Sequence, residues 1–261
     1  MKQGFVSLVG AGPGSVDLLT LGAVKALQKA EVILYDALLA SDVRKLFPKR
    51  AKTVYVGKRC GQHALKQHEI NDLLVAYGQQ GKRVVRLKGG DPFIFGRGAE
   101  EVAALRAAGL AYQIIPGISA MNGIAAEWAL PLTARGHGNE FRAIQGHHLP
   151  DDPAYWHELA HYQGTLVIFM GIEKLPTIIA RLRAFGAERQ RPIAILETDE
   201  EGRTHLSKSQ LGIWQQTGFE KKTKGPGIIY IGSNVSLMES TALNQTHAED
   251  KTDEFTLTRF L

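Results

Sequence analysis

The segment of residues 86–98 constrains the fold of this chain more than any other. It reads Arg-Leu-Lys-Gly-Gly-Asp-Pro-Phe-Ile-Phe-Gly-Arg-Gly, follows the β-branched run 83–85 and precedes a helical pattern over 100–108. A segment between a strand and a helix lies at the carboxyl end of the strand, where open α/β sheets bind their ligands. Glycine there lets the backbone approach a ligand closely, and the Asp adds a carboxylate acceptor. The sequence therefore predicts a ligand-binding loop on an α/β sheet.

Strand-like and helical patterns alternate along the chain. Ile70, Leu73, Leu74 and Tyr77 are spaced as one apolar face of a helix, and a second such pattern covers residues 175–185. Strands that alternate with helices predict a largely parallel sheet with helices on both faces. We expect strands at residues 5–9, 32–35, 53–56, 83–85, 112–115, 141–145, 165–169, 193–196 and 228–231.

A polar, glycine-rich bridge at residues 135–139 interrupts this alternation. We interpret it as a domain boundary, which gives an N-terminal α/β domain over 1–135 and a C-terminal α/β domain over 136–240. Residues 241–261 are charged and rich in Thr, show no hydrophobic period, and are expected to form a flexible tail.

Composition excludes several classes of protein. The 261 residues are 44% hydrophobic, enough for two cores, but no apolar run is long enough to cross a membrane. The first residues lead directly into a strand, so no signal peptide is expected. A single cysteine, Cys60, excludes an internal disulfide, and the pair His147-His148 lacks a third metal ligand. We therefore expect a cytoplasmic protein without a metal, whose net charge of +5 suits an anionic partner.

The glycine loop at residues 10–15, Gly-Ala-Gly-Pro-Gly-Ser, is poorly suited to a dinucleotide. The dinucleotide fingerprint needs a third glycine where Ser15 stands. Pro13 also lacks the backbone N–H that would donate a hydrogen bond to a pyrophosphate. The next helix is expected to start later, capped by Thr20, with Leu21, Val24 and Leu27 facing inward. A cofactor without phosphate fits this loop better, and S-adenosylmethionine is one.

Two ionisable residues directly follow strands. Asp36 follows the strand at 32–35, and Lys58 follows the strand at 53–56. Both are therefore expected at the same edge of the sheet as the loop 86–98. An acid and a base that converge at such an edge provide what proton-transfer chemistry needs. The alternatives are a helix N-cap for Asp36 and a solvated surface charge for Lys58.

Taken together, these segments resemble the motifs of the tetrapyrrole methylases, and within them those of the uroporphyrinogen-III C-methyltransferases. The resemblance rests on the loops at 10–15, 34–39, 56–61 and 86–98 and on Pro-Gly-Ile-Ser-Ala at 116–120. It implies a two-domain α/β fold with the cofactor cleft between the domains, and a homodimer. It also implies S-adenosylmethionine as cofactor, S-adenosylhomocysteine as its product, and a tetrapyrrole rather than a nucleic acid as partner.

The resemblance also implies roles for single residues. Asp36 and Lys58 would be catalytic. Arg59, Arg97 and Arg135 would bind the carboxylates of the substrate. The residues implied for cofactor binding are Pro13, Gly89, Gly90, Asp91, Ile94, Ser119, Ala120, Met170, Asp199 and Gly227. For Ser119 the alternative is simple capping of the helix that follows.

Several positions depart from the pattern of the family. Ala134 replaces a His, Gly227 replaces an Ala, and Asp199 stands where a cofactor-contacting Gly is expected. If that glycine had a positive φ, Asp would cost about 1–2 kcal/mol there, although Asp tolerates this conformation better than most residues. The segment 202–219 also departs from the usual pattern.

The activity that the resemblance implies is methylation of uroporphyrinogen III to precorrin-2 through precorrin-1, which feeds sirohaem and cobalamin biosynthesis. Fused sirohaem synthases carry a further dehydrogenase and chelatase domain, so we expect this chain to perform the methylation alone. Three alternatives stay open. They are a methylase of the same fold that acts on a later corrin intermediate or on ribosomal RNA ribose, a catalytically eroded binding protein, and a nicotinamide dehydrogenase.

Overall fold

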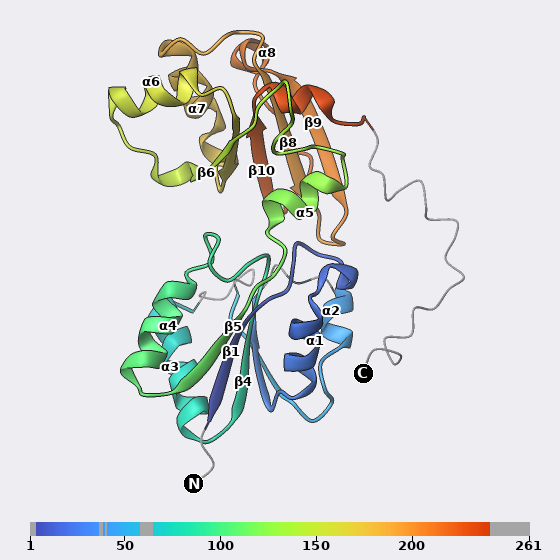
Figure 1. The fold of residues 1–261 in the computed structure, drawn as a ribbon, viewed down its shortest axis with the longest axis vertical. Coiled ribbons are helices and arrows are strands. Elements are labelled where there is room, and N and C mark those ends of the chain that lie inside the picture. Colours follow the sequence, from blue (N-terminus) through green and yellow to red (C-terminus); the bar gives the residue numbers. More distant parts are fainter. Residues whose placement is uncertain (1–3, 37–38, 40, 58–64, 241–261) are drawn as a thin grey trace, which may run out of the picture.

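The computed structural model contains two five-stranded sheets, each packed against helices (Figure 1). The structure describes residues 4–36, 39, 41–57 and 65–240. The first sheet contains β1 (Phe5–Gly10), β2 (Val32–Tyr35), β3 (Lys52–Tyr55), β4 (Arg83–Lys88) and β5 (Ala111–Ile115). The second contains β6 (Phe141–Gln145), β7 (Thr165–Phe169), β8 (Pro192–Thr198), β9 (Thr204–Gln210) and β10 (Gly227–Ile231).

The helices lie between these strands. The α-helices are α1 (Leu21–Gln28), α2 (Ser41–Lys45), α3 (Gln67–Gln79), α4 (Gly98–Ala107), α5 (Ala120–Ala126), α6 (Pro153–His161), α7 (Leu175–Ala184) and α8 (Leu211–Thr217). Short 3₁₀ turns are η1 (Val16–Leu18), η2 (Gly146–His148), η3 (Ile172–Lys174) and η4 (Ser233–Leu237).

The first sheet has the order β3-β2-β4-β1-β5, and all of its strand pairs are parallel. This confirms the prediction made from the alternation of strands and helices. Because parallel strands all point the same way, the loops that follow the five strands emerge at one edge, which we call the carboxyl edge. Figure 1 shows that this edge faces the second sheet.

Helices cover both faces of the first sheet. Alternate strand residues such as Leu8 and Leu34 pack under α3 and α4 with Leu74 and Leu105. Residues on the other face, including Ile33 and Leu87, pack against α1 with Leu27. The period-two alternation of the strands therefore supplies two cores from one sheet.

Helix α1 confirms one prediction and corrects another. Thr20 caps it, since its Oγ1 accepts a hydrogen bond from Ala23 N at 3.1 Å. Val24 and Leu27 are buried as expected, but Leu21 is 56% exposed. Residues spaced by three drift by about 60° per step around a helix, so Leu21 lies about 120° from Leu27 and leaves the buried face.

The second sheet has the order β6-β7-β10-β8-β9 and is mixed. Only β6 and β7 pair in parallel, and the other pairs are antiparallel. The prediction of a largely parallel sheet is therefore wrong for this half of the chain. Strand β9 was not predicted, because its sequence Thr-His-Leu-Ser-Lys-Ser-Gln is polar and lies on the sheet edge, where one side needs no partner strand.

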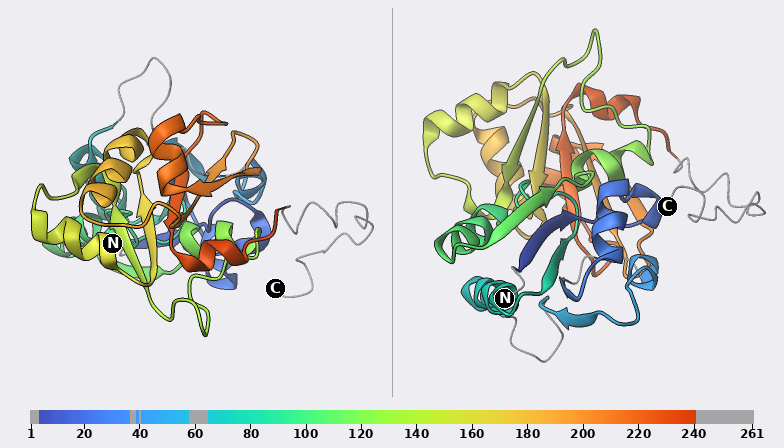
Figure 2. Two further views of the ribbon diagram at one scale, coloured as in Figure 1. Left: turned by 90° about the horizontal axis from the view of Figure 1, so that it is seen from above. Right: turned by 60° about the horizontal axis from the view of Figure 1, so that its bottom comes forward.

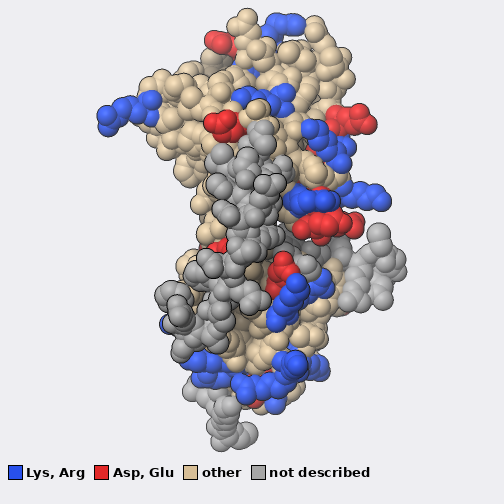
Figure 3. All heavy atoms as spheres, turned by 90° about the vertical axis from the view of Figure 1, so that its right-hand side faces the viewer, with Lys and Arg blue, Asp and Glu red and all other residues tan. Residues whose placement is uncertain are grey.

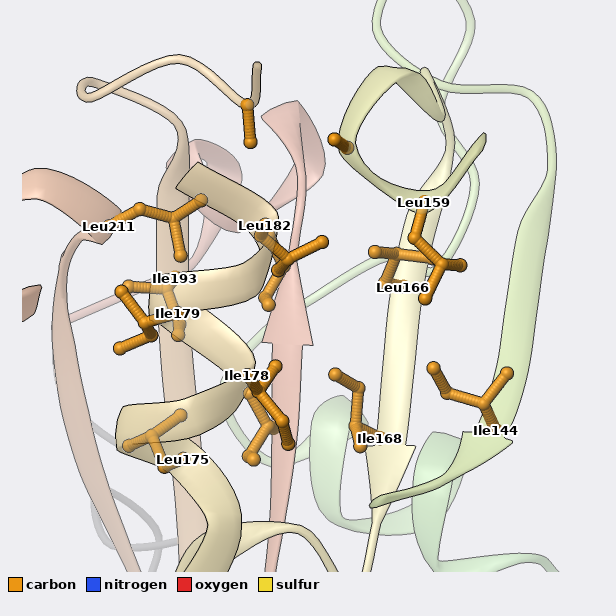
Figure 4. Close-up of a cluster of buried hydrophobic side chains, with 14 of the residues drawn as sticks. Ile144, Leu159, Leu166, Ile168, Leu175, Ile178, Ile179, Leu182, Ile193 and Leu211 are labelled. Atoms are coloured by element: carbon orange, nitrogen blue, oxygen red, sulfur yellow. The ribbon is translucent and has the colours of Figure 1, made fainter. Parts of the chain in front are cut away.

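One hydrophobic core also lies on each face of the second sheet (Figure 2). On one face, α6 and α7 pack against isoleucines and leucines of the strands. Figure 4 shows Leu175, Ile178, Ile179 and Leu182 of α7 pointing toward Ile168 and Ile193 of the strands. On the other face, Ile124, Trp128 and Val235 pack against Val167 and Tyr230.

Helix α5 belongs by its packing to the second sheet, although it lies within the expected first domain. Ile124 and Ala125 of α5, with Trp128 and Leu130 after it, share a core with strands β7, β8 and β10. The division at residue 135 stays a prediction. The packing leads us to propose that the chain changes from one core to the other earlier, at residues 116–119.

Candidate active site

Three loops of the carboxyl edge pack directly against each other through glycine backbone. Gly12 and Gly90 exchange backbone hydrogen bonds, with N to O distances of 3.2 and 2.8 Å. A Cβ added at Gly117 would lie 2.2 Å from the Gly90 carbonyl oxygen, and one added at Gly10 would lie 2.5 Å from Gly117 N. No side chain fits between these loops. The sequence therefore needs glycine here to bring three strand ends together.

Asp91 ties two of these loops together. Its Oδ1 accepts a hydrogen bond from Phe93 N at 2.8 Å, and its Oδ2 accepts one from Gly117 N at 3.1 Å. The first bond shapes the turn of its own loop, and the second holds that loop on the segment before α5. A contact of Asp91 with a cofactor stays a prediction, while its structural role is visible.

Three more predicted residues, Pro13, Ser119 and Ala120, lie around this glycine contact. The Pro13 ring packs on α5, because a Cβ at Gly123 would lie 2.5 Å from Pro13 Cγ. A Cβ at Gly90 would lie 3.6 Å from Ala120 N. Ser119 is buried, but its side chain does not cap α5, which argues against the capping alternative. The structure thus brings Pro13, Gly90, Ser119 and Ala120 together.

The second sheet presents an edge of its own to this site. Because β7 and β8 are antiparallel to β10, the ends of β7 and β8 lie beside the start of β10. Met170 follows β7, Asp199 follows β8, and Gly227 begins β10. The ring of Phe95, on the loop after β4, lies 4.9 Å from the ring of Phe169 between centroids. This contact joins the loop of the first sheet to the edge of the second.

Met170 holds an unusual backbone conformation at that edge. Its φ is +52°, and its side chain is 43% exposed. His147 Nδ1 lies 3.1 Å from the Met170 carbonyl oxygen, so Nδ1 must carry the proton and donate it. Phe95 and Arg97 also have positive φ, at 52° and 58°. A left-handed conformation costs a side-chain-bearing residue about 1–2 kcal/mol, and such outliers gather at functional sites.

Asp199 shapes the hairpin between β8 and β9. Its Oδ1 accepts from the backbone N of Glu201 and Arg203, and its Oδ2 accepts from Arg203 Nε and His205 Nε2, both at 2.9 Å. Its φ is not positive, so the strain considered for a Gly-to-Asp change does not arise. A contact of Asp199 with the cofactor stays a prediction.

These hydrogen bonds also set the charge of Asp199. Partial burial favours the neutral acid, but the hydrogen bonds from His205 and Arg203 outweigh it, and the pKa of Asp199 lies well below its ordinary range. The carboxylate is therefore ionised throughout the physiological range and stabilises the hairpin in that form.

Asp36 lies at the carboxyl edge after β2, as predicted. Its side chain is 22% exposed, and its Oδ2 lies 3.5 Å from a terminal nitrogen of Arg86. The predicted residues Lys58 and Arg59 lie outside the described residues. Arg86 and Lys88, which belong to the loop segment 86–98, are buried, and they pair with the buried Glu101 at 3.0 and 2.9 Å.

The other two predicted arginines differ in position. Arg97 is exposed on the loop after β4 and forms two 2.7 Å hydrogen bonds with Glu100. Arg135 lies in a turn closed by Ala134 N and the Gly138 carbonyl, and Asn234 links that carbonyl to Thr165. Thr165 begins β7, whereas Met170 follows its end. The structure therefore does not bring Arg135 to the edge that holds Met170.

A further group of basic residues lies away from the carboxyl edge. A hollow of about 680 Å³ lies at the opposite edge of the first sheet, where β2 and β4 begin. Figure 3 shows Lys and Arg gathered at this end of the molecule. The basic residues that line the hollow are Lys29, Arg50, Lys52, Lys82 and Arg83.

Comparison with known proteins agrees with this geometry. Residues 6–198 match the family of Tetrapyrrole (Corrin/Porphyrin) Methylases. The chain belongs to the tetrapyrrole methylases. Among the residues that the structure describes, no helix of this methylase is long and apolar enough to cross a membrane.

Curated relatives of the chain include siroheme synthases. The methylase is 43% identical over 242 residues to siroheme synthase 1 of Pectobacterium atrosepticum, which covers 92% of the chain and 50% of that protein. It is 42% identical over 252 residues to the siroheme synthase of Pseudomonas aeruginosa, with 96% and 54% covered. The chain thus spans about half the length of these relatives.

A solved structure matches over its whole length. The uroporphyrin-III C-methyl transferase of Thermus thermophilus, complexed with S-adenyl homocysteine, superposes with a TM-score of 0.75 at 34% identity. The match covers 90% of the methylase and 100% of the Thermus chain. The two-part α/β fold expected from the sequence is therefore confirmed.

Sequence reasoning missed three residues of this site. Phe95 and Phe169 were read as parts of a loop and a strand, and only the structure shows their contact. Glu101 had a signal that was not used: it is a charged residue on the face of α4 that also carries Val102 and Leu105. A carboxylate on an apolar helix face predicts a buried cation beside it.

The glycine contact yields a first prediction. Gly117→Ala places a Cβ against the backbone of Gly90 and Gly10, which cannot move without shifting two strands. We expect a loss of about 1–3 kcal/mol in the free energy of unfolding and weaker cofactor binding. Urea denaturation and calorimetry measure both. Gly22→Ala is the matched control, because its added Cβ meets side-chain atoms only, Ile115 Cγ2 at 3.2 Å and Thr20 Oγ1 at 3.8 Å, and no backbone. Equal stability of the two variants would contradict the packing described.

Asp199 yields a second prediction. Because its pKa is lowered on folding, its stabilisation is present above its ordinary pKa of about 3.9 and is lost as the pH falls further. Asp199→Asn should lower the free energy of unfolding at pH 7 by about 1–3 kcal/mol and flatten its decline below about pH 4. Urea denaturation from pH 2 to pH 7 measures this. Glu201→Gln, at an exposed partner of Arg203, should change little, and an unaltered acid decline in Asp199→Asn would refute the assignment.

Proposed function

We propose that this methylase transfers methyl groups from S-adenosylmethionine to two carbons of uroporphyrinogen III, giving precorrin-2 through precorrin-1. One observation carries the proposal: the glycine loops converge at the carboxyl edge of the first sheet, and this edge faces the edge of the second sheet that holds Met170. The chain with this geometry matches the whole length of the Thermus methyltransferase. The proposal assigns the same reaction to the half of siroheme synthase 1 that this chain matches.

The residues at the two edges fit this cofactor. Gly90 has a φ of +65° and carries no side chain, and the nearest atom to its Cβ position is Ala120 N at 3.6 Å, so a ligand can approach the backbone closely. Exposed apolar side chains stand beside it, with Ile94 38% and Met170 43% exposed. The nearby cations Arg86 and Lys88 are committed to Glu101, which leaves little attraction for a pyrophosphate. We propose that Pro13, Gly89, Gly90, Asp91, Ile94, Ser119, Ala120, Met170, Asp199 and Gly227 hold the cofactor.

The proposed mechanism uses the edge residues to position reactants and move a proton. When bound, S-adenosylmethionine supplies an electrophilic methyl group on sulfur. The loops hold the electron-rich pyrrole carbon in line with it, and this alignment provides much of the acceleration. Methylation of the ring must be balanced by loss of a proton. Asp36, partly exposed at the carboxyl edge, is placed to accept that proton, and Lys58 is the proposed acid.

The substrate carries many carboxylates, and the proposal assigns them to arginines. Arg97 is exposed near the site and would exchange Glu100 for a substrate carboxylate, since a guanidinium binds a carboxylate through two hydrogen bonds. Arg59 is proposed for the same task. Arg135 lies at the far end of its sheet, so it could serve a site only on a second copy of the chain, in the proposed homodimer.

The alternative of an eroded binding protein is not better supported than the proposed reaction. It rests on the departures of the second half from the family pattern, and one of these, Asp199, has an unstrained backbone and a defined role in its hairpin. The cobalt precorrin-4 methyltransferase CbiF matches with a TM-score of 0.73 at 21% identity, and this likeness shows the fold alone. No observation favours a later corrin intermediate, RNA or a nicotinamide cofactor over the proposed reaction.

The proposed function predicts binding and turnover that can be measured directly. Calorimetry should show binding of S-adenosylmethionine and S-adenosylhomocysteine but not of NAD or NADP. Incubation of uroporphyrinogen III with methyl-labelled cofactor should then give tetrapyrrole products that carry one and two added methyl groups by mass spectrometry. Binding of NAD without binding of either sulfur cofactor would overturn the proposal, and cofactor binding without methyl transfer would favour a binding protein.

The catalytic assignments predict losses in turnover rather than in folding. Asp36→Ala and Lys58→Ala should each lower kcat by about 10²–10⁴-fold, the usual contribution of a positioned acid or base. Both residues follow strand ends, so cofactor affinity should change little. The melting temperature of Asp36→Ala should fall only modestly, because the contact of Asp36 with Arg86 is 3.5 Å long and partly exposed. If Lys58→Ala raises only KM, Lys58 holds a substrate carboxylate instead. Near-normal turnover of Asp36→Ala would remove Asp36 as the base.

A further inference from the structure

We propose that Arg86 is the positioning residue that orients Asp36 for proton transfer, and that the buried carboxylate of Glu101 fixes Arg86 in place. The inference rests on the proposed function and adds to it a requirement for two residues that never touch the substrate. Its basis is a chain of contacts that runs from α4 through β4 to the end of β2.

Glu101 forms the buried end of this chain. It lies on α4 and is fully buried. One of its oxygens, Oε1, accepts from Arg86 Nε at 3.0 Å, from Lys88 Nζ at 2.9 Å and from Gln67 Nε2 at 3.3 Å. The other oxygen, Oε2, is buried and has no hydrogen-bond partner among the described residues. Burying a carboxylate is costly unless cations pair with it, and Arg86 and Lys88 do so here.

Arg86 forms the link. Its side chain is 5% exposed, so it cannot bind a substrate directly. Besides the bond to Glu101, it donates to the Leu87 carbonyl at 3.1 Å, and these two bonds fix the plane of the guanidinium. The remaining terminal nitrogen points to Asp36 Oδ2 at 3.5 Å. Strand pairing explains this approach, since Arg86 lies beside Leu34 and Asp36 follows one residue beyond the end of β2.

Lys88 completes the charge balance of this group. It lies 2.9 Å from Glu101, and burial together with the neighbouring guanidinium lowers its pKa while Glu101 opposes the change. Two cations thus share one fully buried anion. The partly exposed Asp36 carboxylate is the second anion, and its position on the guanidinium balances the group. A rigid cation beneath a partly exposed carboxylate orients it toward the edge where the ligands bind.

The test separates orientation of Asp36 from general stability. We expect Arg86→Lys, which keeps the charge but loses the fixed plane, to lower kcat about 10–100-fold with KM and cofactor affinity nearly unchanged, since small misplacement of a catalytic group costs about this much. In an Asp36→Asn background, the same substitution should have little further effect on kcat, because interacting residues are not additive. Glu101→Gln, which keeps the side-chain volume, should reproduce the kcat loss if Arg86→Lys does not fold.

Arg191→Lys is the matched control. Arg191 is a largely buried arginine of the second half that donates to the backbone carbonyls of Leu159, Ala160 and Tyr162. Its substitution should lower the melting temperature without a selective loss of kcat. This inference alone would be overturned by an unchanged kcat in both Arg86→Lys and Glu101→Gln. It would also be overturned if Arg86→Lys lowered kcat equally in the wild-type and Asp36→Asn backgrounds. A wild-type chain without methyl transfer would overturn the proposed function and this inference with it.

Discussion

The direct contact of backbone at Gly10, Gly90 and Gly117 is the constraint on which the rest of the site depends. It brings the ends of β1, β4 and β5 closer than side chains would allow, and the Asp91 carboxylate fastens two of the three loops. Every other element of the site is placed relative to this contact, including the Pro13 ring on α5 and the loop that carries Phe95. The second sheet then closes the site through the edge that holds Met170.

Much of this arrangement could be predicted from the sequence. The β-branched runs of the first half, such as Val32–Tyr35, became strands, and parallel pairing then places Asp36 and the glycine loops at one edge without further information. Helix α7 followed from its apolar period. These predictions succeed because local patterns of burial and the geometry of a parallel sheet decide them.

The remainder depends on contacts that no local pattern encodes. Strand β9 is polar because it lies on a sheet edge, and the sequence alone does not show that β8 turns back to pair with it. Arg86 and Lys88 look like surface cations until Glu101 is found between them. The placement of Arg135 depends on Asn234, ninety-nine positions away in the chain, which holds the neighbouring turn. Pairings at such separations are a property of the fold.

The backbone of Met170 shows what the site costs the protein. A glycine would adopt a φ of +52° without the steric conflict that a side chain meets there, so the fold by itself would gain from losing the side chain. The methionine nevertheless stands at the edge that faces the glycine loops, with its carbonyl held by His147. A search for thermostable variants should therefore find substitutions of Met170 by glycine. Such variants should have an unstrained backbone at this position and weaker ligand binding.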